Sequence, residues 1–486
     1  MKRRLILLAF AALGAILVYS WHGMTQSKTL RVGYLLFVFR QDQTILDPRN
    51  TELVYQYYLL ENLAVGLVRD SSQSPSGYGP GIAESWERLS PTRWIFRLRS
   101  ELAWSDGTLI EPALIAAHIV SLSREKHRHI VYLKKLLSAK IEKRDLILEF
   151  SAPTNDGLVH ELSLADSALL HPDNLTKDWS VTSGPFSVES YAPGKSLVLR
   201  SNPHYRVQSG YPERVELVGF TLDTIGNFFD SVDIDLLKIP LPSFRGSNPK
   251  LLAKAPQVLR GYPTWIYQLY FNTERSLWRD VEARRELALI TERALMGFSY
   301  SDLVRERQLI PKGYSGHLED GGGPNGSSRG ILAGKRLKFY LLPSFADGPQ
   351  IAAALKAGFA KAGVTLDVGY AKDLAAMESD SDLQMTLFAG NQRDAMGSWQ
   401  FMFSPDNGHL RYFRPKVEPF FDKIMTSEEK NTREANVRVL HRHVLKEVYA
   451  VPLFIETDII VASNRVDLSR LNPFDMRLRF YEVQWK

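Results

Sequence analysis

The polar loop at residues 390–399 carries the side chains that are best suited to hold a charged ligand. Asp394 supplies a carboxylate, Arg393 a cation, Asn391 an amide and Trp399 a large aromatic surface. A buried carboxylate can pair with an ammonium group, and charge-assisted hydrogen bonds of this kind are the strong ones. The alternative is a solvated loop in which Asp394 caps a helix and Trp399 packs in a core, because most loop carboxylates bind nothing.

Alternating strand and helix patterns place this loop at one edge of a sheet. Residues 336–342, 364–368 and 382–389 have the pattern of strands, and residues 347–363 predict a helix with one apolar face. Strands that alternate with helices indicate an α/β fold with a largely parallel sheet. Ligands of such sheets bind beyond the carboxyl ends of the strands, which is where the loop begins.

Further elements are expected on either side of this region. Residues 93–99 and 144–150 alternate as half-buried strands, and residues 108–111 fit a capping box that opens a helix. A long helix is predicted over 432–450, and it leads directly into a short strand at 451–455.

No other group of residues predicts a reaction or a metal site. The chain has no cysteine, which removes disulfides, thiolate ligands and cysteine nucleophiles. Motifs of serine hydrolases, phosphate-binding loops and zinc proteases are absent from the sequence. His127 with His129, and His441 with His443, have a spacing that puts them on different faces of a helix. We therefore predict no catalytic residue, cofactor or metal, and a secreted hydrolase is the alternative that turnover of esters, peptides or glycosides would support.

The N-terminus has the pattern of a secretion signal. Lys2, Arg3 and Arg4 precede a nearly unbroken apolar run at residues 5–18. A membrane-spanning helix needs about 20 residues, so residues 1–27 fit a cleaved signal. An uncleaved anchor is the alternative, because the run can be extended to Trp21. Both predict that the body of the protein lies outside the cytoplasm, attached to a membrane only if the signal is retained.

The bulk composition is typical of a large globular protein. With 486 residues the chain is too long for one ordinary core, so two or three lobes are expected. The apolar fraction of 44% and the charged fraction of 23% are ordinary values. The net charge of +6 is spread along the chain without a dense basic stripe, which argues against a nucleic-acid partner.

Four short phrases in a fixed order give the chain a family resemblance. They are Leu-Asp-Pro at 46–48, Ala-Glu-Ser-Trp-Glu at 83–87, Trp-Ser-Asp-Gly-Thr at 104–108, and Ser-Gly-Pro-Phe at 183–186, which runs on to Arg-Ser-Asn-Pro-His-Tyr at 200–205. Their order and spacing resemble the bacterial extracellular solute-binding proteins of family 5, the peptide- and nickel-binding receptors of ABC importers.

The resemblance implies the large, three-domain type of the periplasmic-binding-protein fold, which has mixed sheets and a hinge between two lobes. A discontinuous first lobe is expected at 28–70, 182–262 and 455–486. A small domain is expected at 71–181 and a second lobe at 263–454. The chain would cross between the lobes near 262 and 455.

The resemblance also implies a set of ligand-binding residues. In peptide-binding members the loop equivalent to 390–399 supplies an aspartate that binds the α-amino group of the peptide, and Asp394 is the matching position. Two prolines of the family pattern are missing from this loop. Residues 261–273 resemble the strand that crosses into the second lobe, and ligand peptides pair with extended backbone in the cleft. The cleft residues implied are Tyr262, Trp265, Tyr267 and Gln268, and packing in the core is the alternative for each aromatic.

The function implied is capture by hinge closure. The ligand would be an oligopeptide or similar small polar solute, and the partner would be the permease of an ABC importer in the inner membrane. Contacts on both lobes would favour the closed state of a monomer, with no chemistry performed. A membrane-tethered sensor or accessory protein that keeps the fold without transport is the alternative.

Overall fold

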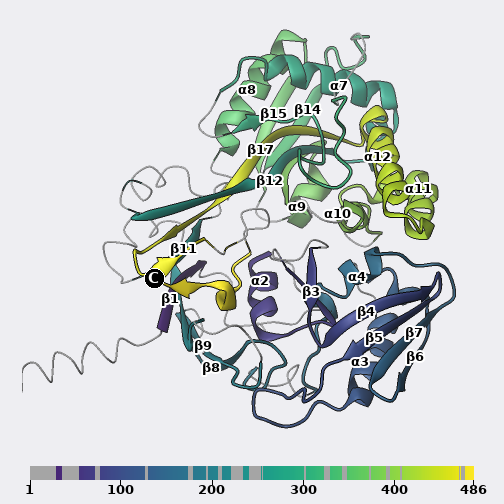
Figure 1. Ribbon diagram of the computed structural model, residues 1–486. Helices are drawn as coiled ribbons and strands as arrows, with labels where there is room; N and C mark the ends of the chain where they lie inside the picture. The colour runs from purple at the N-terminus through teal and green to yellow at the C-terminus, as the bar shows by residue number, and fades with distance from the viewer. Residues whose placement is uncertain are drawn as a thin grey trace, which may run out of the picture.

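The computed structural model shows two large lobes with a smaller domain beside them (Figure 1). We keep the names first lobe, small domain and second lobe for the residue ranges given above. The apolar run at 5–18 and the phrase at 46–48 lie outside the described residues. The structure describes residues 29–35, 54–71, 77–125, 130–172, 179–192, 195–205, 211–220, 234–239, 253, 255–299, 303–321, 329–341, 347–371, 374–389, 395–405, 408–469, 471 and 477–486.

An eleven-stranded mixed sheet runs through both lobes, in agreement with the predicted fold class. Ten strands follow the order β15-β14-β16-β12-β17-β11-β1-β10-β9-β8, and β13 pairs with β17 outside this path. The two central strands, β12 and β17, are long and antiparallel, and they connect the lobes. The bounds are β1 (Thr29–Leu35), β8 (Phe186–Ala192), β9 (Ser196–Ser201), β10 (Arg214–Phe220), β11 (Leu236–Ile239), β12 (Gln257–Phe271), β13 (Val304–Arg305), β14 (Arg336–Leu341), β15 (Thr365–Tyr370), β16 (Leu383–Ala389) and β17 (Ala450–Ala462).

The second lobe contains the predicted alternation of strands and helix. Helix α8 (Gly348–Lys361) connects β14 to β15, and β14 is parallel to both β15 and β16. The apolar face of α8 is buried as the spacing predicts, through Ile351, Leu355 and Phe359. The other helices of the second lobe are α7 (Val281–Ala294), α9 (Leu374–Asp380), α10 (Ala395–Met402), α11 (Arg414–Thr426) and α12 (Lys430–Lys446).

The small domain is built on a separate antiparallel sheet of order β4-β5-β7-β6. Its strand β5 alternates between buried and half-buried residues, as predicted. The capping-box prediction is wrong, because Thr108 bonds to Asp106 in a local turn and the helix begins later, at Pro112. The bounds are β4 (Ala83–Ser90), β5 (Arg93–Leu98), β6 (Leu136–Glu142), β7 (Asp145–Phe150), α3 (Pro112–Arg124) and α4 (Gly157–Glu161).

Shorter elements complete the described part of the chain. Helix α2 (Val54–Leu63) belongs to the first lobe. Two small antiparallel pairs are formed by β2 (Val68–Asp70) with β3 (Tyr78–Pro80), and by β18 (Val466–Asp467) with β19 (Gln484–Trp485).

The boundary between α12 and β17 differs from the prediction. The helix ends at Lys446 rather than continuing to residue 450, and Val448 has a left-handed φ of 49°. A β-branched residue in this conformation cannot continue a right-handed helix. The strand that follows has 13 residues and extends well beyond the predicted end at 455.

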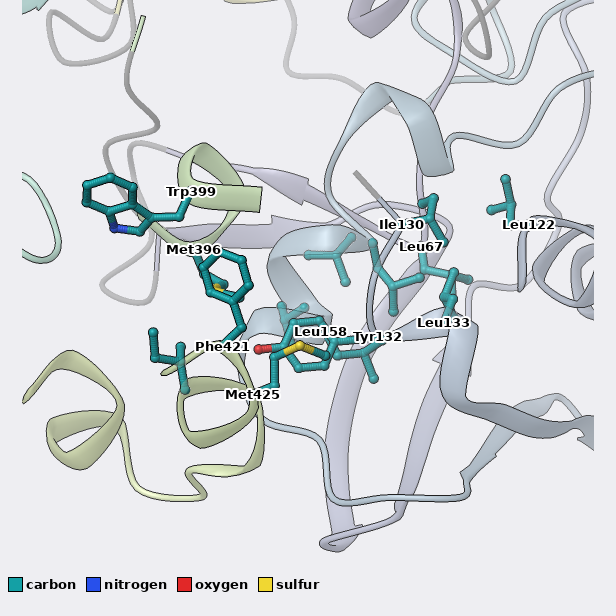
Figure 2. Packing of buried hydrophobic residues seen from close by; sticks show 14 of the residues in the cluster. Leu67, Leu122, Ile130, Tyr132, Leu133, Leu158, Met396, Trp399, Phe421 and Met425 are labelled. Atoms are coloured by element: carbon teal, nitrogen blue, oxygen red, sulfur yellow. The ribbon is translucent and has the colours of Figure 1, made fainter. Parts of the chain in front are cut away.

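Three hydrophobic clusters form the core. One lies in the first lobe and includes Ala165, Ala168 and Trp179 of the small domain, and one lies within the second lobe. The third joins the small domain to helices α10, α11 and α12 of the second lobe, and Figure 2 shows part of it. Within the described residues, no helix combines the length and the apolar character needed to cross a membrane.

Candidate functional site

The loop that carries the strongest sequence signal is only partly described. Asn391, Arg393 and Asp394 lie outside the described residues, so their predicted roles stay predictions. Trp399, on α10, is fully buried, and its ring lies 5.6 Å from that of His441 and 6.2 Å from that of Phe403. The structure therefore places Trp399 in the core, which was the alternative to a ligand contact.

The strand topology fixes the place from which this loop departs. Parallel strands β14 and β16 both end at the same edge of the second-lobe sheet. The last residue of β16, Ala389, pairs with Trp265 of the crossing strand β12. Asp347, which follows the exit of β14, is fully buried next to helix α8. The loop therefore begins where the carboxyl edge of the second-lobe sheet meets the crossing between the lobes.

Tyr267 lies between two buried carboxylates at this crossing. Its hydroxyl oxygen is 3.2 Å from Oδ2 of Asp347 and 3.3 Å from Oε2 of Glu456. All three side chains have at most 2% of their surface exposed. A hydroxyl has one hydrogen, so Tyr267 can donate to only one of the two carboxylates at a time.

A buried ion pair connects the same crossing to the first lobe. The Lys238 ammonium, on β11, lies 2.9 Å from the carboxylate of Asp458, and each side chain is 3% exposed. Trp265 donates its indole N–H to the same carboxylate over 2.9 Å. The ammonium also lies 4.1 Å from the ring centroid of Tyr58, on α2, in a cation–π contact. We call Trp265, Tyr267, Asp347, Glu456, Asp458 and Lys238 the crossing site.

Gln268 points to the opposite face of the sheet from Tyr267. Adjacent residues of a strand alternate between faces, and β12 pairs with β16 in unbroken register here. The bulge between Tyr267 and Gln268 is an extra residue in β17, Leu453, so it leaves this alternation intact. The structure therefore separates Gln268 from the crossing site.

The Gln268 amide has unused hydrogen-bonding capacity. Its side chain is fully buried opposite Thr386, and within the described residues neither atom of the amide has a hydrogen-bond partner. Buried polar groups are nearly always paired with protein, water or a ligand. Gln268 thus offers one acceptor and two donors to a small polar partner. Tyr262 lies in β12, and its side chain is outside the described part of the structure.

Sequence reasoning missed four members of the crossing site: Lys238, Asp347 as a site residue, Glu456 and Asp458. A signal was present for two of them. The sequence Glu456-Thr457-Asp458 interrupts an otherwise apolar run at 450–462, and all but one residue of this run are buried. Polar residues within a buried strand indicate a specific partner. Lys238 carries no comparable signal, since its partner lies far away in the sequence.

The described residues do not assemble a metal site. No group of three or more histidine, aspartate or glutamate side chains within them could hold a metal ion. His441 is fully buried: its Nε2 accepts the backbone N–H of Leu309, and its Nδ1 lies 3.0 Å from the carbonyl oxygen of Gly316. His441 therefore has a structural role in this region.

The crossing site brings charged and aromatic side chains of both lobes together. It combines side chains of both lobes, three buried carboxylates, one ammonium and two aromatic rings. Buried carboxylates favour a cationic group such as an amine, and aromatic rings can pack against its neighbouring apolar atoms. Such a group would be contacted by both lobes at once.

Curated relatives match about half of the chain. A periplasmic oligopeptide-binding protein of Salmonella typhimurium, OppA, is 24% identical over 293 residues. This match covers 52% of the chain and 51% of the relative. The chain thus spans about half the length of the curated relatives that it matches.

Solved structures match over nearly the whole chain. NikA from Brucella suis, in complex with Fe(III)-EDTA, has a TM-score of 0.77 at 16% identity, covering 94% of this chain and 100% of that chain. Haemophilus influenzae OppA, in complex with the peptide RPPGFSPFR, has a TM-score of 0.74 at 14% identity, covering 95% and 99%. At this identity the similarity establishes the two-lobe fold. The family model of the bacterial extracellular solute-binding proteins, family 5 (Middle), matches residues 77–409, and the chain therefore belongs to this family.

Proposed function

We propose that this protein is the substrate-binding receptor of an ABC importer, which captures an oligopeptide or a similar small polar solute between its lobes. The observation that carries the proposal is the crossing site, in which buried charged side chains of both lobes meet at the start of the 390–394 loop. A solute held there would be contacted by both lobes and would favour closure by its differential contacts with the closed state.

The acidic character of the site supports a ligand that carries an amine. Glu456, Asp347 and Asp458 surround the crossing, and Asp394 would add a fourth carboxylate from the loop. An α-amino group suits such surroundings. Arg393 and Asn391 would contact the polar backbone or the carboxylate of the solute, and Trp265, Tyr267 and Tyr262 would pack beside it. Gln268 would form hydrogen bonds with polar atoms of the solute on the opposite face of β12. Trp399 would pack in the core against Phe403 and His441 without touching the solute.

The relatives support a receptor of this kind rather than an enzyme. The Salmonella relative is named an oligopeptide-binding protein, and the solved structures hold a peptide and a metal chelate. We propose a periplasmic monomer that docks on a membrane permease. A membrane-tethered sensor is the second candidate, favoured by the apolar run at 5–18. Mass spectrometry of the membrane fraction separates the two, because a sensor keeps residues 1–27 and a free receptor lacks them.

The experiment is calorimetric titration of the ligand-free protein with trialanine and with N-acetyl-trialanine. We expect binding of the free peptide and at least tenfold weaker binding of the acetylated one, because acetylation removes the ammonium charge. Asp394→Ala should weaken binding of trialanine and leave the acetylated peptide unaffected. Asp367→Ala, at an exposed ion pair with Arg336, is the matched control and should bind as the parent does. Equal binding of both peptides by the parent would exclude the amine anchor, and failure of a wider peptide panel would exclude a peptide ligand.

A further inference from the structure

We infer that Asn155 is a positioning residue for closure, which fastens the small domain onto the second lobe. Asn155 belongs to the small domain and is 2% exposed. The two hydrogens of its side-chain NH₂ group are shared among three carbonyl oxygens of the second lobe, those of Ile424 (3.0 Å), Met425 (3.1 Å) and Ser427 (2.8 Å). These carbonyls lie at the C-terminal end of helix α11.

The end of a helix is a suitable target for this contact. The last four carbonyl groups of an α-helix have no partner within the helix, so they need a donor from elsewhere. Here the donor comes from another domain, more than 260 residues away in the sequence. Separation of the two domains would leave both the amide and the carbonyls without these bonds.

Asn155 is held in the orientation that this contact requires. Its Oδ1 accepts a hydrogen bond from the Tyr132 hydroxyl at 2.8 Å and another from the Gly157 backbone N–H at 2.9 Å. These bonds identify the oxygen side of the amide and direct its NH₂ group towards α11. A Cβ atom at Gly157 would lie 2.3 Å from the Tyr132 hydroxyl, so only glycine fits beside it. Glu161 accepts the backbone N–H groups of residues 131–133 and fixes this segment.

The polar contact is surrounded by apolar packing between the same two domains. Tyr132 and Leu158 of the small domain form one buried cluster with Phe421 and Met425 of α11 and Met396 of α10 (Figure 2). Burial of apolar surface on both sides makes closure favourable in itself. At the rim, Arg88 lies 3.6 Å from the carboxylate of Glu428, a half-exposed pair that contributes little.

The pattern of hydrogen bonds shows which interface would part on opening. Backbone and core contacts join the small domain to the first lobe: the Val188 N–H of β8 donates to the Trp179 carbonyl, and Ala165 and Ala168 belong to the first-lobe cluster. Within the described residues, no backbone hydrogen bond joins the small domain to the second lobe. The small domain therefore moves with the first lobe, and opening separates Asn155 from α11.

The consequence is a contact that stabilises the closed state whether or not a ligand is bound. This inference needs only the two-lobe fold and does not depend on the identity of the ligand. Loss of one buried hydrogen-bonding group should raise the ratio of open to closed molecules by about tenfold, the equivalent of about 1.4 kcal/mol.

The test measures the distance between the two domains in the ligand-free full chain. The protein has no cysteine, so spin labels can be placed at chosen sites. Leu137→Cys on the small domain and Val439→Cys on α12 replace exposed residues (70% and 47% exposed) and report closure by pulsed electron paramagnetic resonance. A second pair, Leu137→Cys with Arg200→Cys on the first lobe, reports a distance that closure does not change.

We expect one short distance for the closure pair in the parent and an added longer distance in Asn155→Leu, with the second pair unchanged. The matched control is Asn202→Leu, which removes another buried asparagine, bonded to Gly184 within the first lobe. It should lower stability without changing the closure distance. Two results would overturn the inference. One is that the ligand-free parent shows only the long distance for the closure pair. The other is that Asn155→Leu folds and gives the same distance distribution as the parent.

Discussion

The ammonium of Lys238 lies 2.9 Å from the carboxylate of Asp458 at the crossing between the lobes, and water reaches almost none of either side chain. A buried charge that loses its partner is strongly destabilising. The pair therefore makes the junction of β11 and β17 depend on two side chains that are far apart in sequence.

We predict that Lys238→Met lowers the free energy of unfolding by about 3–5 kcal/mol, because Asp458 is left as an unpaired buried charge. Adding Asp458→Leu should recover part of this loss, since apolar residues can replace a buried pair. The measurement is urea unfolding. Lys338→Met, which breaks the exposed pair with Asp380, is the control and should change stability little. A loss for Lys238→Met no larger than that of the control would contradict the prediction.

Gln268→Met should stabilise the ligand-free protein by about 1 kcal/mol, because it removes a buried amide that has no partner within the described residues. The contrasting variant is Gln308→Met. Gln308 is also buried, but its amide bonds to both the N–H and the carbonyl of Leu318. Its replacement should destabilise the protein by about 1–3 kcal/mol. If both variants unfold at lower urea concentration than the parent, the Gln268 amide is satisfied in solution.

The same Gln268 variant tests ligand contact. If the amide serves a ligand, Gln268→Met should bind trialanine more weakly while being more stable without it. If the affinity for trialanine is unchanged, Gln268 does not contact the ligand.

Trp399→Phe should reduce stability while leaving ligand affinity unchanged, because the indole ring packs in the core against Phe403 and His441. Trp399→Ala should cost about 3–5 kcal/mol, the usual range for a large aromatic removed from a core. Thermal unfolding and calorimetric titration check the two parts. A fall in affinity without a fall in stability would place Trp399 at the ligand after all.

His441 should make the protein less stable in acid. Burial lowers the pKa of His441 from 6.5 to about 4, and its Nε2 accepts a backbone N–H that protonation would oppose. The unfolded chain then binds a proton between about pH 6.5 and pH 4 that the folded chain does not. The stability from His441 is therefore complete above pH 6.5 and is lost as the pH falls towards 4, by at most about 3 kcal/mol.

The check is urea unfolding at pH 7.5 and pH 4.5 for the parent and for His441→Gln. Burial raises the pKa of Glu161 to about 7, which acts in the opposite direction. The informative quantity is therefore the difference between the two proteins. We expect the parent to lose more stability than His441→Gln between the two pH values. His204→Gln, at an exposed turn, should behave as the parent does, and identical pH profiles for the parent and His441→Gln would contradict the prediction.

Local patterns predicted elements well and the site only in part. The spacing of Ile351, Leu355 and Phe359 was enough to predict α8, because one buried face determines a helix. The capping box failed because the Asp106 side chain competes for Thr108 in a local turn. The Lys238–Asp458 pair and the Asn155 contact join residues more than 200 positions apart, and no periodicity along the chain encodes such contacts.

The central claim, capture of a small polar solute, is tested most directly by native mass spectrometry of protein purified gently from its own host. We predict an added mass that dissociates on activation and fragments as a peptide or another small amine. A bare protein, which also shows no thermal shift with a library of di- to pentapeptides, would contradict the account and favour a sensor or accessory protein.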